Sequence, residues 1–387
     1  MKKTLIITLE FPPHIGGVAT YVHDVAHALD PEKTIILAPK VPSDFKEEVQ
    51  GEDRYQCIRK NLLFPRWLWP RWLKLCWLVW LICRKEKIEL IMIHHILPAG
   101  YPAWLMRKFL KIPYLVFSHG TDIAAASRTK WKAFMAQKVA LSSEQIVCNS
   151  DSLARRLLIR FPKLAGKVSV VYPCPQEIFI NPVEPEKISE LKQNLALQGK
   201  KVILSVARLV DGKGFPHLVR VMSEVVKINP TIVWIIIGTG PKLQQIITDV
   251  EKNNLQNIVR FIGDVPHDTM PPYFQAADLF ILLTHPDNGQ EEGLGLVFLE
   301  AAAAGLAAIA GKSGGVEEAI RNGQTGLVFD VYRESKSIVE SIVTLLRDTS
   351  YRQSLGKNAQ QRIKAEFNWP HQLERISPWL ETPDNGK

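Results

Sequence analysis

The strongest constraint on this chain is a rhythm of short, uninterrupted apolar runs that occurs twice along its 387 residues. In the first half these runs occupy residues 4–8, 34–37, 90–93, 114–117 and 145–148. After residue 200 the rhythm restarts, at 202–206, 233–237, 259–262, 279–283 and 307–310. Apolar strands separated by longer amphipathic segments are typical of a parallel sheet covered by helices on both faces. The pattern predicts two doubly wound α/β domains.

The length of the chain agrees with two domains, because one hydrophobic core stops growing well below 387 residues. The prolines at 173 and 175 forbid a helix there, so the linker is predicted near 173–182. We therefore expect an N-terminal domain over 1–175 and a C-terminal domain over 176–367. The tail, 368–387, has the pattern of one more helix and is expected to cross back to the N-terminal domain.

The composition limits the partners and the compartment. Lys and Arg number 48 against 39 Asp and Glu, which gives a net charge of +9 and favours an anionic partner. The five Cys have neither zinc-ligand nor disulfide-framework spacing, which suits a reducing cytosol. The apolar N-terminal run ends at Glu10, too early for a signal peptide, and is predicted to be a buried strand.

A pair of glycines, Gly16 and Gly17, follows the first predicted strand and precedes a helical stretch. Glycines at such a turn let a ligand approach backbone N–H groups at a helix N-terminus, where the helix dipole favours an anion. The site is suited to a diphosphate. A tight turn without a ligand is the alternative interpretation.

A second glycine-containing loop follows the strand at 202–206 and carries Arg208 and Lys213. Open α/β sheets bind ligands at the carboxyl ends of their strands, and two cations there can neutralise a diphosphate leaving group. The alternative is a pair of solvated surface charges.

The most specific segment runs from Glu291 to Gly305 and contains Glu292, two glycines and Glu300. Eight positions are a little over two helical turns, so the spacing predicts that Glu300 lies along the face that begins near Glu292. One carboxylate could then hold sugar hydroxyls and the other a ribose diol. The alternative is that Glu292 caps the helix and Glu300 is a buried acid with its own partner.

This segment resembles the acidic signature of the retaining family-four glycosyltransferases of GT-B fold, in which two Rossmann-like domains face each other across a cleft. It is most similar to the bacterial phosphatidylinositol-mannoside mannosyltransferases, which share Glu-Gly-Leu-Gly. The likeness covers nearly the whole chain. It includes Gly16-Gly17, Ser118-His119-Gly120, Asn149-Ser150, Arg208, Lys213, Gly238-Thr239-Gly240-Pro241, Gly263 and Gly314-Gly315-Val316-Glu317-Glu318.

The resemblance implies a role for each matching residue. Arg208 and Lys213 would bind the diphosphate and stabilise it as it leaves, and His119 would sit beneath the donor sugar near the reacting carbon. Glu292 and the following amides would hold the donor sugar, and Glu300 the ribose. The residues implied in donor binding are Gly16, Gly17, Gly238, Gly263, Gly293, Leu294, Gly295, Leu296 and Glu300. No cofactor and no metal are expected, and the chain has no Asp-x-Asp motif.

A tryptophan-rich segment lies between Arg66 and Lys87 and holds half of the chain's ten Trp, interleaved with basic residues. Aromatic and basic side chains together are attracted to the headgroup region of an anionic membrane. The residues expected to touch it are Trp67, Trp69, Arg71, Trp72 and Lys74. The apolar run 75–83 is too short to span a bilayer. A buried helix with a basic rim is the alternative.

The resemblance implies a hexosyltransferase that uses a nucleotide diphosphate sugar, with GDP-mannose as the first candidate and UDP-hexoses next. The acceptor would be lipid-linked or a glycan, and the protein would be cytoplasmic and peripheral at the inner face of the plasma membrane. No nucleic-acid module is recognisable. A sugar-nucleotide epimerase, a phosphorylase and a catalytically inert sugar-nucleotide-binding or membrane-scaffold protein are the rival interpretations. The sequence makes no prediction of the oligomeric state.

Overall fold

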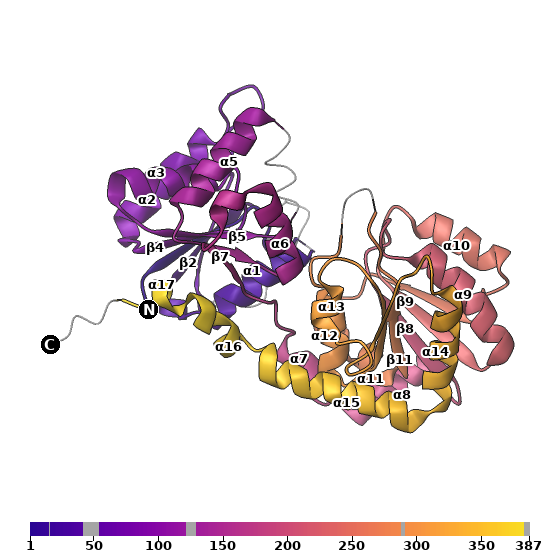
Figure 1. Ribbon diagram of the computed structural model, residues 1–387. Coiled ribbons are helices and arrows are strands. Elements are labelled where there is room, and N and C mark those ends of the chain that lie inside the picture. The colour runs from indigo at the N-terminus through magenta and orange to yellow at the C-terminus, as the bar shows by residue number, and fades with distance from the viewer. Residues whose placement is uncertain (15, 42–53, 121–128, 288–290, 383–387) are drawn as a thin grey trace. The chain divides into compact units, whose positions relative to one another are not determined.

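The computed structural model describes residues 1–14, 16–41, 54–120, 129–287 and 291–382. It consists of two compact units (Figure 1). The first unit is Met1–Pro173 together with Trp369–Lys387, and the second is Cys174–Asn368. Each unit is built on one parallel sheet with helices on both faces, which confirms the predicted fold class of two Rossmann-like domains.

The sheet of the first unit has seven strands in the order β3-β2-β1-β4-β5-β6-β7, all parallel. Thr4 of β1 pairs with Thr34 of β2 on one side and with Leu90 of β4 on the other. The strands are β1 Thr4–Ile7, β2 Thr34–Pro39, β3 Gln56–Lys60, β4 Leu90–Ile93, β5 Tyr114–Ser118, β6 Gln145–Cys148 and β7 Val168–Val170. The central strands are wholly buried, as continuous apolar runs require.

Helices cover both faces of this sheet. One core cluster joins the sheet to α2 (Leu73–Glu86), α3 (Gly100–Leu110), α5 (Lys130–Ser142) and α6 (Asp151–Arg160). The other joins it to α1 (Gly17–Ala28) and to the C-terminal segment.

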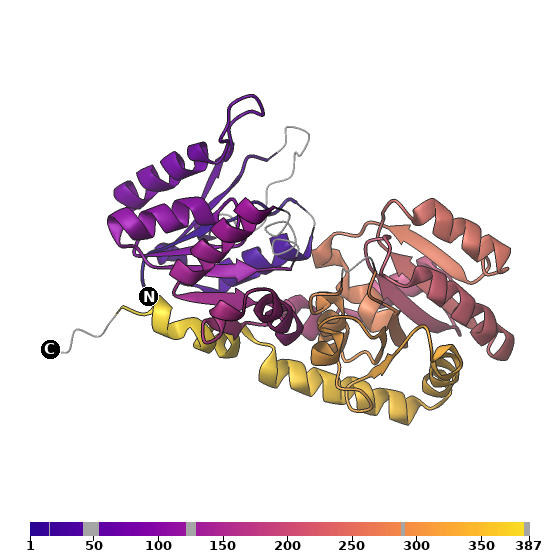
Figure 2. The same cartoon turned by 45° about the horizontal axis from the view of Figure 1, so that its top comes forward.

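The C-terminal segment consists of α16 (Trp369–Leu373), a 3-10 turn and α17 (Ser377–Leu380), beside the chain's N-terminus (Figure 1, Figure 2). Ile376 and Leu380 are buried in the core, and Lys2 N donates to Leu380 O at 2.6 Å. The expectation of one continuous helix is wrong. Pro378 has no N–H to continue the preceding turn and instead occupies the first turn of α17.

The sheet of the second unit has six parallel strands in the order β10-β9-β8-β11-β12-β13. They are β8 Lys201–Val206, β9 Ile232–Ile237, β10 Val259–Gly263, β11 Leu279–Leu282, β12 Ala308–Gly311 and β13 Leu327–Phe329. The ten predicted strands are all present in the two sheets. The structure adds β3, β7 and β13, each at an edge of its sheet.

The helices of the second unit form two groups, and the last helix of the first group also contacts the last helix of the second (Figure 1). The first group is α9 (Phe215–Ile228), α10 (Leu243–Lys252) and α14 (Ser335–Arg347). The second group is α7 (Glu177–Ile180), α8 (Pro185–Asn194), α11 (Pro271–Ala276), α12 (Leu296–Ala303) and α15 (Thr349–Glu366). The short helix α13 (Val316–Ala319) contacts α12.

Candidate active site

The strand order of the second sheet reverses between β8 and β11. From β8 the chain moves outward through β9 to β10, and it then returns to β11 on the other side of β8. Open α/β sheets bind ligands outside the carboxyl ends of strands at such a switch point. The loops that follow β8 and β11 carry Lys213 and Glu292 respectively, so both predicted residues lie where this topology favours a ligand.

Close backbone packing fixes the loop after β8. Gly214 has a φ of +77°, and a Cβ placed there would lie 1.8 Å from Leu283 O. His285 N donates to Gly212 O at 2.9 Å, which ties the same loop to the chain beyond β11. Only glycine permits this approach at position 214, because any side chain would overlap the backbone of Leu283. The loop therefore holds Lys213 in a defined place.

Lys213 and Glu292 form an ion pair, with Nζ 2.5 Å from Oε2. The side chains are 26% and 17% exposed, so the pair is shielded from solvent without being buried. The main chain of Glu292 is held by two further hydrogen bonds. Glu292 N donates to Ser313 Oγ at 3.1 Å, and Gly315 N donates to Glu292 O at 3.2 Å.

Glu292 precedes the helix that carries Glu300, so the predicted helical face does not extend as far as Glu292. Helix α12 begins at Leu296, after Gly295 with a φ of +85°. A left-handed glycine ends the preceding turn rather than continuing it into the helix. No side chain caps the amino-terminal end of α12, so Glu292 is not its cap either. Gly293, Leu294 and Gly295 form the short connection between the carboxylate and the helix.

Glu300 is buried within α12 and has a partner. Its Oε1 lies 2.8 Å from His267 Nε2, and the His267 ring packs against Phe179 at 5.0 Å between centroids. The interpretation of Glu300 as a buried acid with its own partner thus describes this structure. His267 had no signal in the sequence, since it follows β10 and is 33 residues away from Glu300.

The other predicted residues of this unit lie at the carboxyl ends of β8, β9 and β10. Arg208 is exposed after β8, and Gly238 follows β9, where a Cβ would lie 2.1 Å from Ala207 O. Gly263 ends β10, and its carbonyl accepts from Gly238 N at 2.8 Å. The loops that hold Arg208, Gly238 and Gly263 are therefore packed on one another.

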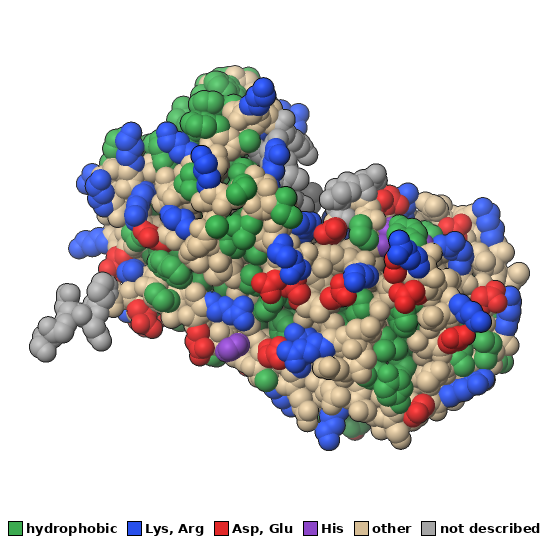
Figure 3. All heavy atoms as spheres, viewed as in Figure 1, with side chains coloured by type: hydrophobic (Ala, Val, Ile, Leu, Met, Phe, Trp, Pro, Cys, Tyr) green, Lys and Arg blue, Asp and Glu red, His purple; other side chains and the backbone are tan. Residues whose placement is uncertain are grey.

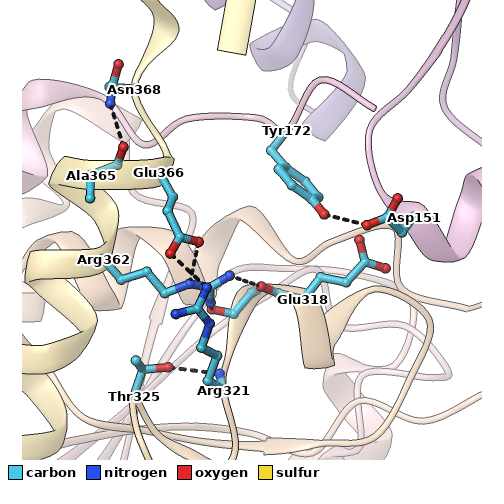
Figure 4. A network of polar contacts seen from close by, with 10 residues as sticks. Asp151, Tyr172, Glu318, Arg321, Thr325, Arg362, Ala365, Glu366 and Asn368 are labelled. Atoms are coloured by element: carbon cyan, nitrogen blue, oxygen red, sulfur yellow. Dashed lines mark hydrogen bonds and ion pairs between the residues drawn. The ribbon is translucent and has the colours of Figure 1, made fainter. Parts of the chain in front are cut away.

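Arg362 anchors the segment behind Glu292 (Figure 4). Its guanidinium donates to the carbonyl oxygens of Glu318 and Ala319, at 2.7 and 2.9 Å, and to Glu366 Oε2 at 2.8 Å. Arg321 binds the other oxygen of Glu366 at 2.8 Å. Helix α15 thus holds α13, and α13 directly follows the Ser313–Gly315 stretch that supports Glu292.

The first sheet has its own switch point, between β1 and β4. Gly16 and Gly17 follow β1 at the start of α1, whose amino-terminal end no side chain caps. A Cβ on either glycine would meet no described atom within 4 Å. The space beside both glycines is therefore open among the residues described, which do not include position 15.

His119 follows β5 and joins a histidine cluster that sequence reasoning missed. His119 Nε2 lies 3.3 Å from His94 Nδ1, and the two rings stack at 5.5 Å between centroids. His95 Nε2 lies 3.7 Å from Glu10 Oε1. A signal was available, because His94 and His95 follow an apolar strand just as His119 does.

Electrostatics set the charge states in this cluster. Complete burial, reinforced by His119 and His95, holds the pKa of His94 well below its usual 6.5, so His94 is neutral near pH 7. Contact with His95 lowers the pKa of Glu10. A neutral His94 orients the His119 ring without adding charge beside it.

Comparison with known proteins finds two family models, which match the two halves of the chain. Residues 15–174 match the family model for Glycosyltransferase Family 4, and residues 187–362 match that for Glycosyl transferases group 1. The chain belongs to the family-four glycosyltransferases of GT-B fold. The two matches together cover most of this glycosyltransferase.

Relatives of this glycosyltransferase match it over its full length. A GDP-mannose-dependent monoacylated alpha-(1-6)-phosphatidylinositol monomannoside mannosyltransferase of Corynebacterium glutamicum is 27% identical, with 98% of each chain covered. A GDP-mannose-dependent alpha-(1-6)-phosphatidylinositol monomannoside mannosyltransferase of Mycobacterium tuberculosis is 23% identical, with 99% of each covered. The structure of Anabaena HepE in complex with UDP has a similar fold, with a TM-score of 0.80, 19% identity, and coverage of 98% of this chain and 99% of HepE.

The tryptophan-rich segment of this glycosyltransferase is partly solvent-exposed. Trp67 and Trp69 are 82% and 83% exposed, which the alternative of a buried helix does not explain. Trp72 instead stacks on Tyr101 at 4.4 Å, and Arg71 Nε donates to Phe64 O at 2.8 Å. Lys74 is half-buried and lines a pocket beside β2 and β3. No helix among the described residues is long and apolar enough to cross a bilayer.

Proposed function

We propose that this glycosyltransferase moves a hexose, with retention of anomeric configuration, from a nucleotide diphosphate sugar to a lipid-linked or glycan acceptor at a membrane surface. GDP-mannose is the first candidate donor, because the relatives of C. glutamicum and M. tuberculosis are named for it. A UDP-hexose is the second, since HepE was solved with UDP. The observation that carries the proposal is the Lys213–Glu292 pair at the switch point of the second sheet.

The diphosphate is assigned to Arg208 and Lys213. Both cations lie on the loop after β8, and Gly238 and Gly263 bring neighbouring backbone close to the same edge of the sheet. Arg208 is exposed and offers a planar fork of donors for two phosphate oxygens. The uncapped amino-terminal end of α12 adds a favourable dipole for an anion.

The sugar is assigned to Glu292 and the amides of Gly293, Leu294, Gly295 and Leu296. In the structure Glu292 is bound to Lys213, so a donor has to exchange this pair for two new contacts. The phosphate takes the ammonium and a sugar hydroxyl takes the carboxylate. The ion pair keeps both groups in place before the donor arrives and avoids leaving either charge unpaired.

Glu300 is assigned to the ribose diol. Its Oε1 is engaged by His267, which holds the carboxylate in one orientation within the buried interior of α12. His267 then acts as a positioning residue for Glu300. Glu292 is thus assigned to the sugar, and Glu300 is assigned to the nucleoside.

The reaction breaks the anomeric C–O bond toward an oxocarbenium-like centre while negative charge accumulates on the departing diphosphate. Fixed cations and N–H dipoles aimed at that charge act in the transition state, and each donor can contribute about 3 kcal/mol. Arg208 and Lys213 are these donors, and we infer that no metal and no cofactor takes part. His119 is assigned to the sugar beside the reacting carbon, with neutral His94 behind it.

The membrane location is assigned to Trp67, Trp69, Arg71, Trp72 and Lys74, at the cytoplasmic face of the plasma membrane. Trp67 and Trp69 are exposed aromatic side chains beside basic ones, a combination that binds the headgroup region. A lipid-linked acceptor would then be delivered to the first unit from the bilayer.

The decisive experiment incubates the protein with GDP-mannose and with UDP-hexoses in turn and follows the products. The proposal requires release of a nucleoside diphosphate and, with a membrane extract as acceptor source, an α-linked product from an α-linked donor, established by NMR. An epimerase would return an intact nucleotide sugar with altered stereochemistry. An inert binding protein would bind donor without turnover, and either result would overturn the proposal.

A further inference from the structure

Helix α5 of the first unit is apolar on two opposite sides. Its residues Ala136, Val139 and Ala140 are buried in the core cluster that contains the sheet, and Met135 is buried as well. On the outer side, Trp131 is 67% exposed and Phe134 and Leu141 are also exposed. Their spacing of three and seven residues places them in one stripe. Apolar residues around a whole helix are typical of a helix covered on both sides, and the sheet covers only one side of α5.

A basic pocket of about 700 Å³ opens between the carboxyl-terminal ends of α3 and α5. Its charged lining consists of Arg107, Lys108, Lys111, Lys167 and a single acid, Glu144. The pocket lies at the amino-terminal edge of β5, β6 and β7, the edge opposite to the one that carries His119. It is therefore separate from the histidine cluster.

Two of these cations are already used within the protein. Arg107 is paired with Glu144, and Lys167 Nζ donates to Leu141 O and Ser143 O at 2.7 and 2.8 Å. The ammonium groups of Lys108 and Lys111 form no ion pair with any described residue. The pocket thus keeps a net positive charge that is directed outward.

Aromatic rings alternate with the cations across the same surface. Lys108 lies over the Trp104 ring at 5.8 Å, and Lys138 lies over it from α5 at 5.2 Å. Phe109, next to Lys108, is 62% exposed. At the boundary between acyl chains and headgroups, such rings can bury their apolar faces in the membrane. The neighbouring ammonium groups then stay in water.

We propose that the outer face of α3 and α5 is a bilayer-contact surface, with a pocket that takes the phosphate of an anionic phospholipid headgroup. This surface, formed by Lys108, Phe109, Lys111, Trp131, Phe134, Lys138 and Leu141, is called the α3/α5 face. The proposal of a bilayer-contact surface rests on the proposed function only because that function places the acceptor at a membrane. This face is distinct from the tryptophan-rich segment between Arg66 and Lys87, most of which forms α2, and helix α3 packs between α2 and α5. Figure 3 shows hydrophobic and basic side chains interspersed on the visible side of the first unit.

The bilayer is favoured over a soluble phosphate because charge complementarity and exposed apolar area occur on one surface. A free phosphate would need the cations alone and would leave Trp131 and Phe109 uncovered. An anionic bilayer satisfies both, since each basic residue near such a surface contributes about 1 kcal/mol and each exposed ring gains apolar contacts.

The test is co-sedimentation of the full chain, without donor, with vesicles of phosphatidylcholine alone or mixed with phosphatidylglycerol. Lys108→Gln with Lys111→Gln removes the free charge of the pocket, and Phe109→Ser with Trp131→Ser removes the exposed rings. Lys252→Gln with Lys357→Gln is the matched control, because both lysines are exposed in the second unit and form no ion pair with a described residue.

We expect the Lys108/Lys111 variant to bind phosphatidylglycerol vesicles about tenfold or more weakly than the unmodified protein, with the control unchanged. The Phe109/Trp131 variant should lose affinity for both kinds of vesicle. Nucleoside diphosphate release from donor in solution should be normal in both. That measurement separates a failure of this inference from a failure of the proposed function.

Three results would overturn the inference. One is unchanged vesicle binding by both variants. Another is complete loss of binding in Trp67→Ser with Trp69→Ser while the α3/α5 variants bind normally, which would assign the bilayer to the tryptophan-rich segment alone. The third is displacement of the protein from vesicles by millimolar inorganic phosphate at constant ionic strength, which would identify a soluble-anion site.

Discussion

Lys213 and Glu292 are 79 residues apart in the chain, and their side chains meet at 2.5 Å at the switch point of the second sheet. We expect Lys213→Ala and Glu292→Ala each to lower the rate of nucleoside diphosphate release by about 10²–10³-fold, as loss of a transition-state contact does. Stability should change little, because a partly exposed ion pair contributes at most about 1 kcal/mol.

The control for this prediction is Lys242→Ala. Lys242 forms another ion pair in the same unit, with Asp211 at 3.0 Å, but has no assigned contact with donor. Turnover should remain near that of the unmodified protein. Normal turnover in the Lys213 and Glu292 variants would contradict the site assignment.

Gly214 and Gly212 allow a matched test of backbone packing. Both have φ near +80°, but a Cβ at 214 would lie 1.8 Å from Leu283 O, whereas at 212 the nearest atom is at 3.4 Å. Gly212→Ala should lower the free energy of unfolding by about 1–2 kcal/mol, the cost of the left-handed conformation. Gly214→Ala should cost more than about 3 kcal/mol. Urea unfolding distinguishes the two, and equal losses would refute the packing argument.

The lowered pKa of His94 predicts that the stability of the first unit depends on pH. Burial first, then His119 and His95, lower its folded-state pKa, so the folded state does not take up the proton that the unfolded chain binds below about pH 6.5. Its contribution to stability is complete above that pH. It is lost as the pH falls, at about 1.4 kcal/mol per pH unit.

The measurement is hydrogen exchange of β4 and β5 amides at pH 7, 6 and 5, in the unmodified protein and in His94→Gln. Other histidines titrate with the same sign. Burial, then Arg220 and His285, lower the pKa of His217 to about 4 in the second unit. The informative quantity is therefore the difference in slope between the two proteins, and parallel slopes would count against a neutral His94.

Arg362 tests whether the contacts between α15 and the α13 segment stabilise the second unit. In Arg362→Met the carbonyls of Glu318 and Ala319 lose a charged donor, which should cost about 2–4 kcal/mol of unfolding free energy. Arg333→Met is the control, because that side chain is 86% exposed and lies 3.6 Å from Asp330. It should change stability by less than about 0.5 kcal/mol. Equal melting temperatures for the two variants would show that the network carries no stability.

The sequence predicts the interior of both sheets and misses most of the edges. The interior strands are continuous apolar runs such as Ile232–Ile237, every residue of which is buried. The missed strands lie at edges. Gln56–Lys60 is polar and only partly buried, and Val168–Val170 and Leu327–Phe329 have three residues each. A strand with one neighbour needs no long apolar run, so its pattern is weak.

The residues of the candidate site could likewise be predicted only in part from the sequence. Charges on a glycine-containing loop after an apolar strand pointed to Lys213, the acidic segment with its glycines pointed to Glu292, and the family resemblance pointed to His119. Partners that depend on tertiary packing were out of reach. Nothing in the local pattern joins Ser313 to Glu292 or His267 to Glu300, because the strands between them set those contacts.

The return of Trp369–Leu380 to the first unit has a consequence for biosynthesis. Ile376 and Leu380 are part of the core that α1 packs against, yet the ribosome makes them after the whole second unit, Cys174–Asn368. At about 5–20 residues per second this delay lasts on the order of 10–40 s. During that interval an apolar surface of the nascent first unit stays uncovered, so this unit completes its core only after the second unit has been made.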